Sequence, residues 1–323
     1  MKPAIAITLV FLACCSNVVF LEFMVSEFPG SGNLITFSQF LLISIEGFVF
    51  TAKCGTKAPV IPFRYYLFMV TLFFAIQVGS NAVFSFNISM PLQMIFRSGS
   101  LVANLIMGMI ILKRSYKMSK FVSVALITCG IIICTLSSAS QVESHPNHTG
   151  DVMYDFLIWL VGLGMLVFCL MMTAWMGIFQ EQTYQKFGKH PSEALFYNHC
   201  LPLPLFLFLA KDIYNHVILL NSSDPVLIPI LEFSIPKMWI FLIFNNITQY
   251  ICIRSVFILT TECQSLTVTL VVTLRKFISL IFSVLYFQNP FTVYHTIGAI
   301  LVFFGTLLFT EIIPLGKAKI KEH

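Results

Sequence analysis

Charged residues are scarce in this chain. Asp, Glu, Lys and Arg make up only 10% of its 323 residues, against roughly 25% in an ordinary soluble domain. The hydrophobic fraction is 58% and the mean hydropathy is +0.89. A soluble core of this length could not hide so much apolar surface, so the composition excludes a soluble globular protein and indicates a polytopic membrane protein.

The sequence also lacks the usual marks of an enzyme. It has no Gly-rich phosphate loop, no Gly-x-Ser-x-Gly motif and no His/Cys cluster at metal-ligand spacing. His145 and His148 lie in an acidic loop and are too few for a metal site. The net charge of +5 is spread over short loops, which argues against nucleic acid as a partner. We therefore expect no enzymatic activity, metal or cofactor.

Long apolar segments, in contrast, are abundant. With about 20 residues for one membrane-spanning helix, we predict an all-α integral membrane protein of ten transmembrane helices, without strands. The first segment is too long for a signal-peptide core of about 7–15 residues, so we interpret it as a retained helix. The predicted ranges are 4–24, 33–51, 65–86, 91–112, 120–139, 154–177, 193–210, 237–259, 263–287 and 292–314.

The distribution of lysine and arginine predicts the orientation. If the N-terminus is cytosolic, most of the 19 basic residues lie on or near the cytosolic side, and only Lys211 and Lys237 lie on the other. We therefore expect both termini in the cytosol. Glycosylation sequons at Asn87, Asn147 and Asn221 would then be lumenal. None of the nine cysteines falls in a predicted lumenal loop, so we expect no disulfide framework.

The two halves of the chain echo each other. Phe28-Pro29-Gly30 in the first half and Phe187-Gly188-Lys189 in the second are each followed, at the same spacing, by an aromatic-polar-polar triplet, and Arg97 and Arg275 occupy corresponding helices. Five helices per half is an odd number, so the halves would have opposite orientations. We predict two inverted five-helix repeats, 1–139 and 154–314. A lumenal loop, 140–153, joins them, and a cytosolic tail, 315–323, follows the second.

Three cations interrupt apolar segments of membrane length. Arg97 lies inside one, and Arg275 and Lys276 stand side by side in the middle of another. A charge near the bilayer centre costs at least about 2.5–3.5 kcal/mol, so it is retained for a partner or a function. Binding of an anionic substrate is one interpretation. Pairing with Glu46 or Glu262, or snorkelling to the membrane surface, is the alternative.

Other polar side chains in apolar segments are candidates for substrate contacts. Tyr197, Asn198 and His199 form a motif in which a ring beside an amide could stack on a base and read its edge, although ordinary helix packing fits equally well. Further candidates could either contact a ligand or link helices, and two acids, Glu46 and Glu311, could carry protons. The further candidates are Gln39, Asn245, Gln249, Thr273 and Ser279.

These motifs resemble those of a known family. Phe196-Tyr197-Asn198-His199 is similar to the FYNN motif of nucleotide-sugar transporters in the drug/metabolite transporter superfamily, with His199 in place of the last Asn. The segment 272–276 lies where those transporters carry GALNK; its Leu and Lys agree, and Arg275 replaces the Asn. The resemblance extends nearly end to end, and the Arg-Lys form is similar to the subfamily that carries UDP-linked sugars.

The resemblance implies an antiporter. It would carry a UDP-sugar, UDP-N-acetylglucosamine or UDP-xylose, from the cytosol into the lumen of the endoplasmic reticulum or Golgi in exchange for UMP. Tyr197 and Asn198 would hold the base, and Lys276 would meet phosphate or sugar. A GDP-linked sugar, a sulfonucleotide or a sugar phosphate stays open as the cargo, and a membrane-embedded glycosyltransferase is the alternative from another class.

The C-terminal tail carries a possible sorting signal. Lys319 and Lys321 stand fifth and third from the C-terminal end, as in dilysine signals that coat proteins recognise for retrieval to the endoplasmic reticulum. Simple anchoring by positive charge on the cytosolic side is the alternative. The sequence leaves a monomer and a homodimer equally open.

Overall fold

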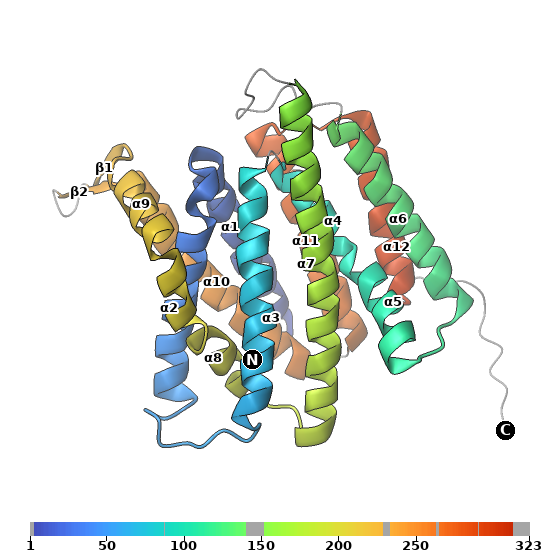
Figure 1. Ribbon diagram of the computed structural model, residues 1–323, viewed down its shortest axis with the longest axis horizontal. Coiled ribbons are helices and arrows are strands. Elements are labelled where there is room, and N and C mark those ends of the chain that lie inside the picture. The colour runs from blue at the N-terminus through green and yellow to red at the C-terminus, as the bar shows by residue number, and fades with distance from the viewer. Residues whose placement is uncertain are drawn as a thin grey trace.

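The protein is a bundle of long helices, as the computed structural model in Figure 1 shows. The structure describes residues 3–86, 88–139, 152–228, 233–262, 265–289 and 291–312. The α-helices of the described residues are α1 Pro3–Glu27, α2 Gly32–Phe50, α3 Phe63–Ala82, α4 Met90–Ser98, α5 Ser100–Leu112, α6 Met118–Ala139, α7 Val152–Phe187, α8 Pro191–Cys200, α9 Ala210–Asn221, α10 Lys237–Glu262, α11 Ser265–Phe287 and α12 Val293–Phe309.

The helical membrane character is confirmed. Within the described ranges, eight helical segments are long and apolar enough to cross a membrane, and Val293–Phe309 is a shorter apolar helix. Helices lie in all ten predicted ranges, while the count of ten spans and the inverted repeat stay predictions. The expectation of no strands is wrong, because β1 (Pro225–Ile228) and β2 (Phe233–Pro236) pair as an antiparallel hairpin between α9 and α10. It lies at the edge of the bundle (Figure 1), outside the apolar helices.

One predicted helix is divided at a glycine. The range 91–112 forms α4 and α5, with Gly99 between them and its N–H bonded to the Phe96 carbonyl in a tighter turn. A Cβ at this position would lie 2.9 Å from that same carbonyl oxygen and 3.1 Å from Ile131. The backbone of the tight turn itself therefore favours a glycine here, and the Ile131 side chain of α6 adds a second close contact.

Another predicted helix is divided by prolines. α8 ends at Cys200, a 3₁₀ segment runs over Leu203–Leu209, and α9 follows. Pro202 and Pro204 remove two backbone donors within one turn, which prevents an unbroken α-helix. The motif that contains Tyr197 therefore lies on a short helix of its own.

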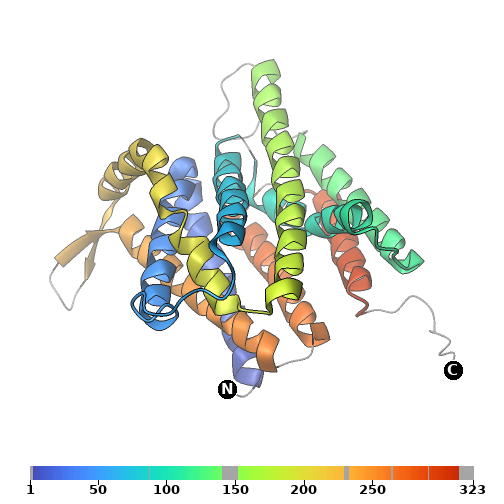
Figure 2. The same cartoon turned by 60° about the horizontal axis from the view of Figure 1, so that its bottom comes forward.

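Packing between helices does not follow the chain halves. α6 and α12, the last helices of the two halves, pack along their length at one edge of the bundle (Figures 1 and 2). Gly130 and Gly298 make this contact close, since a Cβ on Gly298 would lie 2.7 Å from the Gly130 carbonyl oxygen. α1 packs against α10 and α11, whereas α7 packs against α3 and α5.

A disulfide corrects one expectation. Cys14 of α1 is bonded to Cys252 of α10. The expectation of no disulfide considered only the lumenal loops, and it missed two cysteines inside apolar helices that pack together. The bond lies within the contact between α1 and α10, so it ties a helix of the first half to one of the second.

Some predictions fall on residues outside the described ranges. These are the sequons at Asn87 and Asn147, the loop histidines His145 and His148, and the tail lysines Lys319 and Lys321. Asn221 is described, and its side-chain oxygen accepts a hydrogen bond from Trp239 Nε1 at 2.7 Å. The described N-terminal helix begins at Pro3 and continues to Glu27, which is the length expected of a spanning helix.

Candidate anion site

The three intramembrane cations converge in space. Arg97 is in the last turn of α4, and Arg275 and Lys276 lie in the middle of α11. α4 packs against α11, and Ser98, the neighbour of Arg97, lines the same cavity as Lys276. Among the residues that the structure describes, no carboxylate forms a salt bridge with any of the three. This concentration of positive charge is therefore uncompensated within the described protein.

Glu46, one of the two acids proposed as partners, pairs with a different cation. Glu46 Oε1 accepts from Arg254 at 2.6 Å and from Tyr250 at 3.1 Å, which links α2 to α10. The side chain of Glu262 lies outside the described residues. Structural pairing with Glu46, one of the alternatives from the sequence, is thus wrong.

A cavity of about 240 Å³ lies beside Lys276. It is bounded by α11, α12 and the junction of α4 and α5. The side chains of Lys276 and Arg97 have exposed surface although both lie within spanning segments. The lining residues are Ser98, Ser100, Leu101, Val268, Val272, Thr273, Lys276, Phe277, Thr306 and Thr310. An ammonium group among hydroxyls can receive an anion there.

Two polar atoms near the cations lack partners. Arg275 Nε and Ser279 Oγ are buried without a hydrogen bond in the described protein. They lie one helical turn apart on α11, and α1 approaches this segment where Cys15 Sγ contacts the Arg275 carbonyl. A buried donor without a partner costs about 1–3 kcal/mol. A ligand oxygen that accepted a hydrogen bond from Arg275 Nε would therefore bind firmly.

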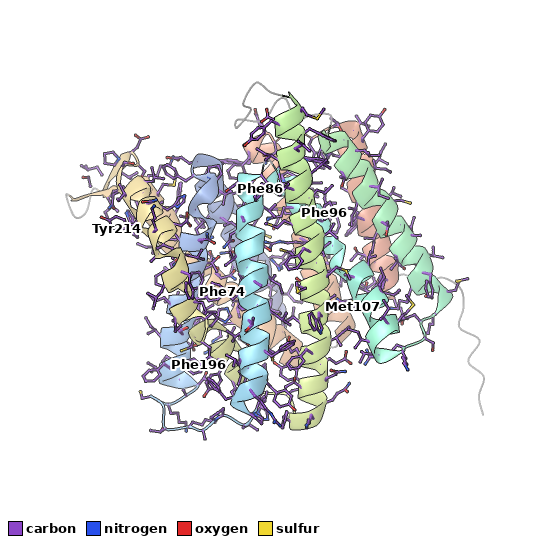
Figure 3. The ribbon with its side chains drawn as sticks, in the orientation of Figure 1. Phe74, Phe86, Phe96, Met107, Phe196 and Tyr214 are labelled. Atoms are coloured by element: carbon purple, nitrogen blue, oxygen red, sulfur yellow. A yellow bond between two sulfur atoms is a disulfide. The ribbon has the colours of Figure 1, made fainter. Side chains whose placement is uncertain are left out.

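Within the motif on α8, Tyr197 and Asn198 have surroundings different from those of His199. Tyr197 stacks on Tyr66 with ring centroids 4.7 Å apart, and Asn198 Oδ1 is buried without a hydrogen-bond partner. Figure 3 places Phe196 of α8 near the lower end of the bundle and Phe96 of α4 in its upper half. The α8 motif and the end of α4 therefore lie at different heights in the bundle.

His199 is part of the packing between α8 and its neighbours. Its ring is 8% exposed and lies 4.7 Å from the Phe40 ring and 5.4 Å from the Phe73 ring. Its Nδ1 is bonded to the Leu195 carbonyl at 2.7 Å. The residue that departs from the family motif therefore has a structural position here.

We expect His199→Ala to lower stability without changing ligand selectivity. Loss of the ring leaves a void between Phe40 and Phe73, which costs about 1–3 kcal/mol of unfolding free energy. Thermal unfolding of the purified protein measures the effect. His199→Phe should restore most of the lost stability, because it fills the same space. An unchanged melting midpoint in the alanine variant would contradict this assignment.

Of three other candidates, two link helices to one another and the third keeps its side chain free to contact a ligand. Asn245 is fully buried, and its side chain accepts from Gln39 at 2.6 Å and donates to the Asn17 carbonyl at 3.0 Å. Asn17 donates in return to the Asn245 carbonyl. Asn245 and Gln39 thus hold α1, α2 and α10 together. Gln249, one turn along α10, has no recorded hydrogen bond and keeps its amide available.

A buried carboxylate was missed by the sequence reasoning. Glu22 of α1 is 4% exposed, and its Oε1 accepts from Ser283 and Asn289. Its Oε2 is buried without a partner. The signal was present, since an acid inside an apolar run has the same cost as a cation.

Glu311 lies beyond the end of α12 and contacts two lysines. Lys120 and Lys117 lie 3.4 Å and 3.5 Å from its Oε1. The positive charges of Lys120 and then Lys117 lower the pKa of Glu311. Glu311 therefore stays ionised at neutral pH, which favours an ion pair at the end of α12 over the proton-carrying role considered from the sequence.

The fold and the site together define a multi-pass membrane protein with a cavity beside an intramembrane lysine, an architecture that suits a transporter. The chain belongs to the UAA transporter family, whose model matches residues 2–313. This finding confirms the resemblance to nucleotide-sugar transporters and identifies a transporter rather than an enzyme.

Relatives of known name are similar over nearly the whole chain. The "UDP-xylose and UDP-N-acetylglucosamine transporter" of Danio rerio is 58% identical over 100% of this chain and 98% of its own. The "Nucleotide sugar transporter SLC35B4" of Homo sapiens is 58% identical over 97% of this chain and 95% of its own. The "Endoplasmic reticulum GDP-fucose transporter" of Drosophila melanogaster is 54% identical over 97% and 91%.

Proposed function

We propose that this protein is an antiporter that carries UDP-N-acetylglucosamine or UDP-xylose from the cytosol into the lumen of the endoplasmic reticulum or Golgi, in exchange for UMP. The name of the Danio rerio relative supports the cargo, and the endoplasmic reticulum appears in the name of the Drosophila melanogaster relative. Both termini face the cytosol in this proposal, as the distribution of basic residues predicts.

The observation that carries the proposal is the cluster of three cations without a carboxylate partner beside a cavity. A pyrophosphate diester brings two negative charges, and a phosphate monoester about 1.5–2 at neutral pH. Either ligand would leave the cluster with a similar small net charge. An unfilled site would instead have to move the full positive charge through the membrane, which explains obligatory exchange.

The packing of the helices supports the inverted repeat. If α1 corresponds to α7 and α11 to the α4–α5 pair, the contact of α1 with α11 corresponds to that of α7 with α5. In the same way, the contact of α1 with α10 corresponds to that of α7 with α3. In this arrangement the cations lie between the repeats, where transporters of this plan bind their substrate.

Within the site, we assign the phosphates to the cations and the base to α8. Lys276 and Arg275 would hold the pyrophosphate, with Arg97 completing the positive field. Tyr197 would stack on the base, and the unpaired Oδ1 of Asn198 would accept from its edge. Thr273, which lines the cavity, and Ser279 and Gln249 would contact the remaining polar groups.

The proposal is tested by exchange in proteoliposomes that contain the purified protein. We expect uptake of radiolabelled UDP-N-acetylglucosamine or UDP-xylose to be at least tenfold faster into vesicles preloaded with UMP than into vesicles preloaded with AMP. Covalent turnover of the nucleotide sugar without uptake would favour a glycosyltransferase instead. Uptake that is independent of the preloaded nucleotide would contradict antiport.

A GDP-linked sugar is the second candidate, favoured by the name of the Drosophila melanogaster relative at 54% identity. Guanine and uracil both offer a ring N–H next to a carbonyl, so the unpaired oxygen of Asn198 fits either base. The same vesicles preloaded with GMP and supplied with GDP-fucose decide between them.

A further inference from the structure

Two glutamates occupy matching places in the halves of the chain. Glu22 lies in the last two turns of α1, and Glu181 lies in the last two turns of α7. The offset between them is the same one that relates Phe28-Pro29-Gly30 to Phe187-Gly188-Lys189. Each of these carboxylates forms a link to a helix of the other half.

The first link joins α1 to the end of α11. Glu22 Oε1 accepts from Ser283 Oγ and from Asn289 Nδ2, each at 2.6 Å. Ser283 is in α11, and Asn289 lies two residues beyond its end. The Glu22 side chain is buried, and its second oxygen has no partner.

The second link joins α7 to the end of α5. Glu181 accepts from both terminal nitrogens of Arg114, at 2.6 Å and 3.3 Å. Arg114 lies two residues beyond the end of α5, as Asn289 does beyond α11. The residue between helix and partner has positive φ in both places, at 49° for Lys113 and 49° for Gln288. The two links are thus built alike.

The links lie at opposite ends of the bundle. α7 and α5 end at its lower end in Figure 1, whereas α1 ends at its upper end. The first link is on α11, which carries Arg275 and Lys276, and the second is at the end of α5, which follows the α4 segment that carries Arg97. Separation of either link would therefore free one of the two segments that border the cavity.

Resting on the proposed antiport, we propose that the Glu22–Ser283–Asn289 link and the Glu181–Arg114 link are the two gates of the transport cycle, one on each face of the membrane. In alternating access, contacts between the repeats at one face separate while those at the other stay closed. Glu22 and Glu181 are positioning residues in this cycle, and neither touches the cargo.

Both links are suited to open at low cost. The side chains of Arg114 and Glu181 are 43% and 42% exposed, and a solvated ion pair contributes only about 0–1 kcal/mol. A cavity of about 230 Å³ lies beside this pair. The Glu22 link is dry, but its unpaired oxygen would gain water on opening, which offsets the two hydrogen bonds that break.

Cross-linking tests the gates directly. The pairs Glu22→Cys with Asn289→Cys and Glu181→Cys with Arg114→Cys are made separately, reconstituted, and treated with a short, cleavable bifunctional thiol reagent. We expect each cross-link to reduce UMP/UDP-sugar exchange at least tenfold, and cleavage to restore it. Ligand binding, measured by UMP-induced thermal stabilisation, should survive in the cross-linked protein, because the cavity itself is unchanged.

A contact within one half of the chain provides the matched control. Thr36→Cys with Asn81→Cys joins α2 to α3, where the Asn81 amide donates to the Thr36 hydroxyl at 2.7 Å, and its cross-link should leave exchange intact. If loss of Glu22 prevents folding, Phe23→Cys with Phe287→Cys bridges the same helices, because those rings lie 4.8 Å apart.

The outcomes separate the gates from the antiport. Exchange that persists after either gate is cross-linked would overturn the gate proposal while leaving the antiport intact. Absence of nucleotide-sugar exchange in the unmodified protein would overturn the proposed function itself. Wild-type protein treated with the same reagent corrects for reaction of the native cysteines.

Discussion

Lys276→Ala is expected to abolish nucleotide-sugar exchange in proteoliposomes. Lys276 is the cation that directly lines the cavity, and a hydrogen bond to a charged group contributes about 1.5–3 kcal/mol, or roughly 10–150-fold in binding. The dry surroundings strengthen this contact further. Initial rates of UDP-sugar uptake into UMP-loaded vesicles measure the loss.

The same variant should not be less stable than the wild-type protein. Lys276 is repelled by Arg275 and Arg97, and no described carboxylate offsets these charges. Removing one of three like charges lowers the repulsion in the unliganded protein. We therefore expect an unchanged or higher thermal midpoint without ligand, together with loss of the stabilisation that UMP gives to the wild-type protein.

Lys237→Ala is the matched control for charge. Lys237 lies at the start of α10, with its ammonium 5.5 Å from the centre of the Phe241 ring, and it does not line the cavity. Its loss removes the same charge from the protein but should leave exchange within about twofold of wild type. Normal uptake by Lys276→Ala would refute the anion site.

The helices were predictable because the length of each apolar segment can be read from the sequence and compared with the thickness of a membrane. The breaks were harder to predict. A glycine such as Gly99 is tolerated inside many membrane helices. Only the structure shows that this one lies in a tighter turn, where a Cβ would be 2.9 Å from the Phe96 carbonyl oxygen. The prolines at Pro202 and Pro204 were visible, but their effect depends on whether neighbouring groups replace the lost hydrogen bonds.

The cations of the site were predictable because charge in an apolar run is rare. Their surroundings were not, since partners come from distant segments. Glu22 is hydrogen-bonded to Asn289, and Cys14 forms a disulfide with Cys252. In both pairs, most of the chain separates the two residues in the sequence. A single sequence gives no distance between such residues, so the disulfide and the buried acid were both missed.

The α8 motif shows a different limit. Neighbouring residues on a helix point about 100° apart, so three consecutive side chains cannot share one surface. Tyr197 meets Tyr66, His199 enters the packing beside Phe40, and Asn198 keeps a buried oxygen without a partner. The motif as a string therefore predicted more ligand contacts than one helix face can provide.

Asn198→Ala is expected to weaken base selectivity without loss of stability. The buried oxygen of Asn198 has no donor in the free protein, so its removal eliminates an unsatisfied acceptor instead of a hydrogen bond. In the complex it would accept from the base, a contact of about 0.5–1.5 kcal/mol, or roughly 2–12-fold. Competition of UDP-sugar uptake by UMP and CMP should show the two inhibition constants drawing together by about this factor, because cytosine lacks the ring N–H that uracil offers to Asn198. The ratio of the constants for UMP and GMP should stay unchanged, because both bases offer that N–H.

Asn246→Ala is the control, since it removes an amide of the same size from a membrane helix. The Asn246 oxygen accepts from Ser38 Oγ at 3.1 Å, so its loss breaks an interhelical contact and should lower the thermal midpoint while selectivity is unchanged. The two asparagines would thus show opposite behaviour, one affecting recognition and the other affecting stability. If Asn198→Ala instead behaved as Asn246→Ala does, the base would have to be read elsewhere, and only the assignment of the phosphates to Lys276 would stand.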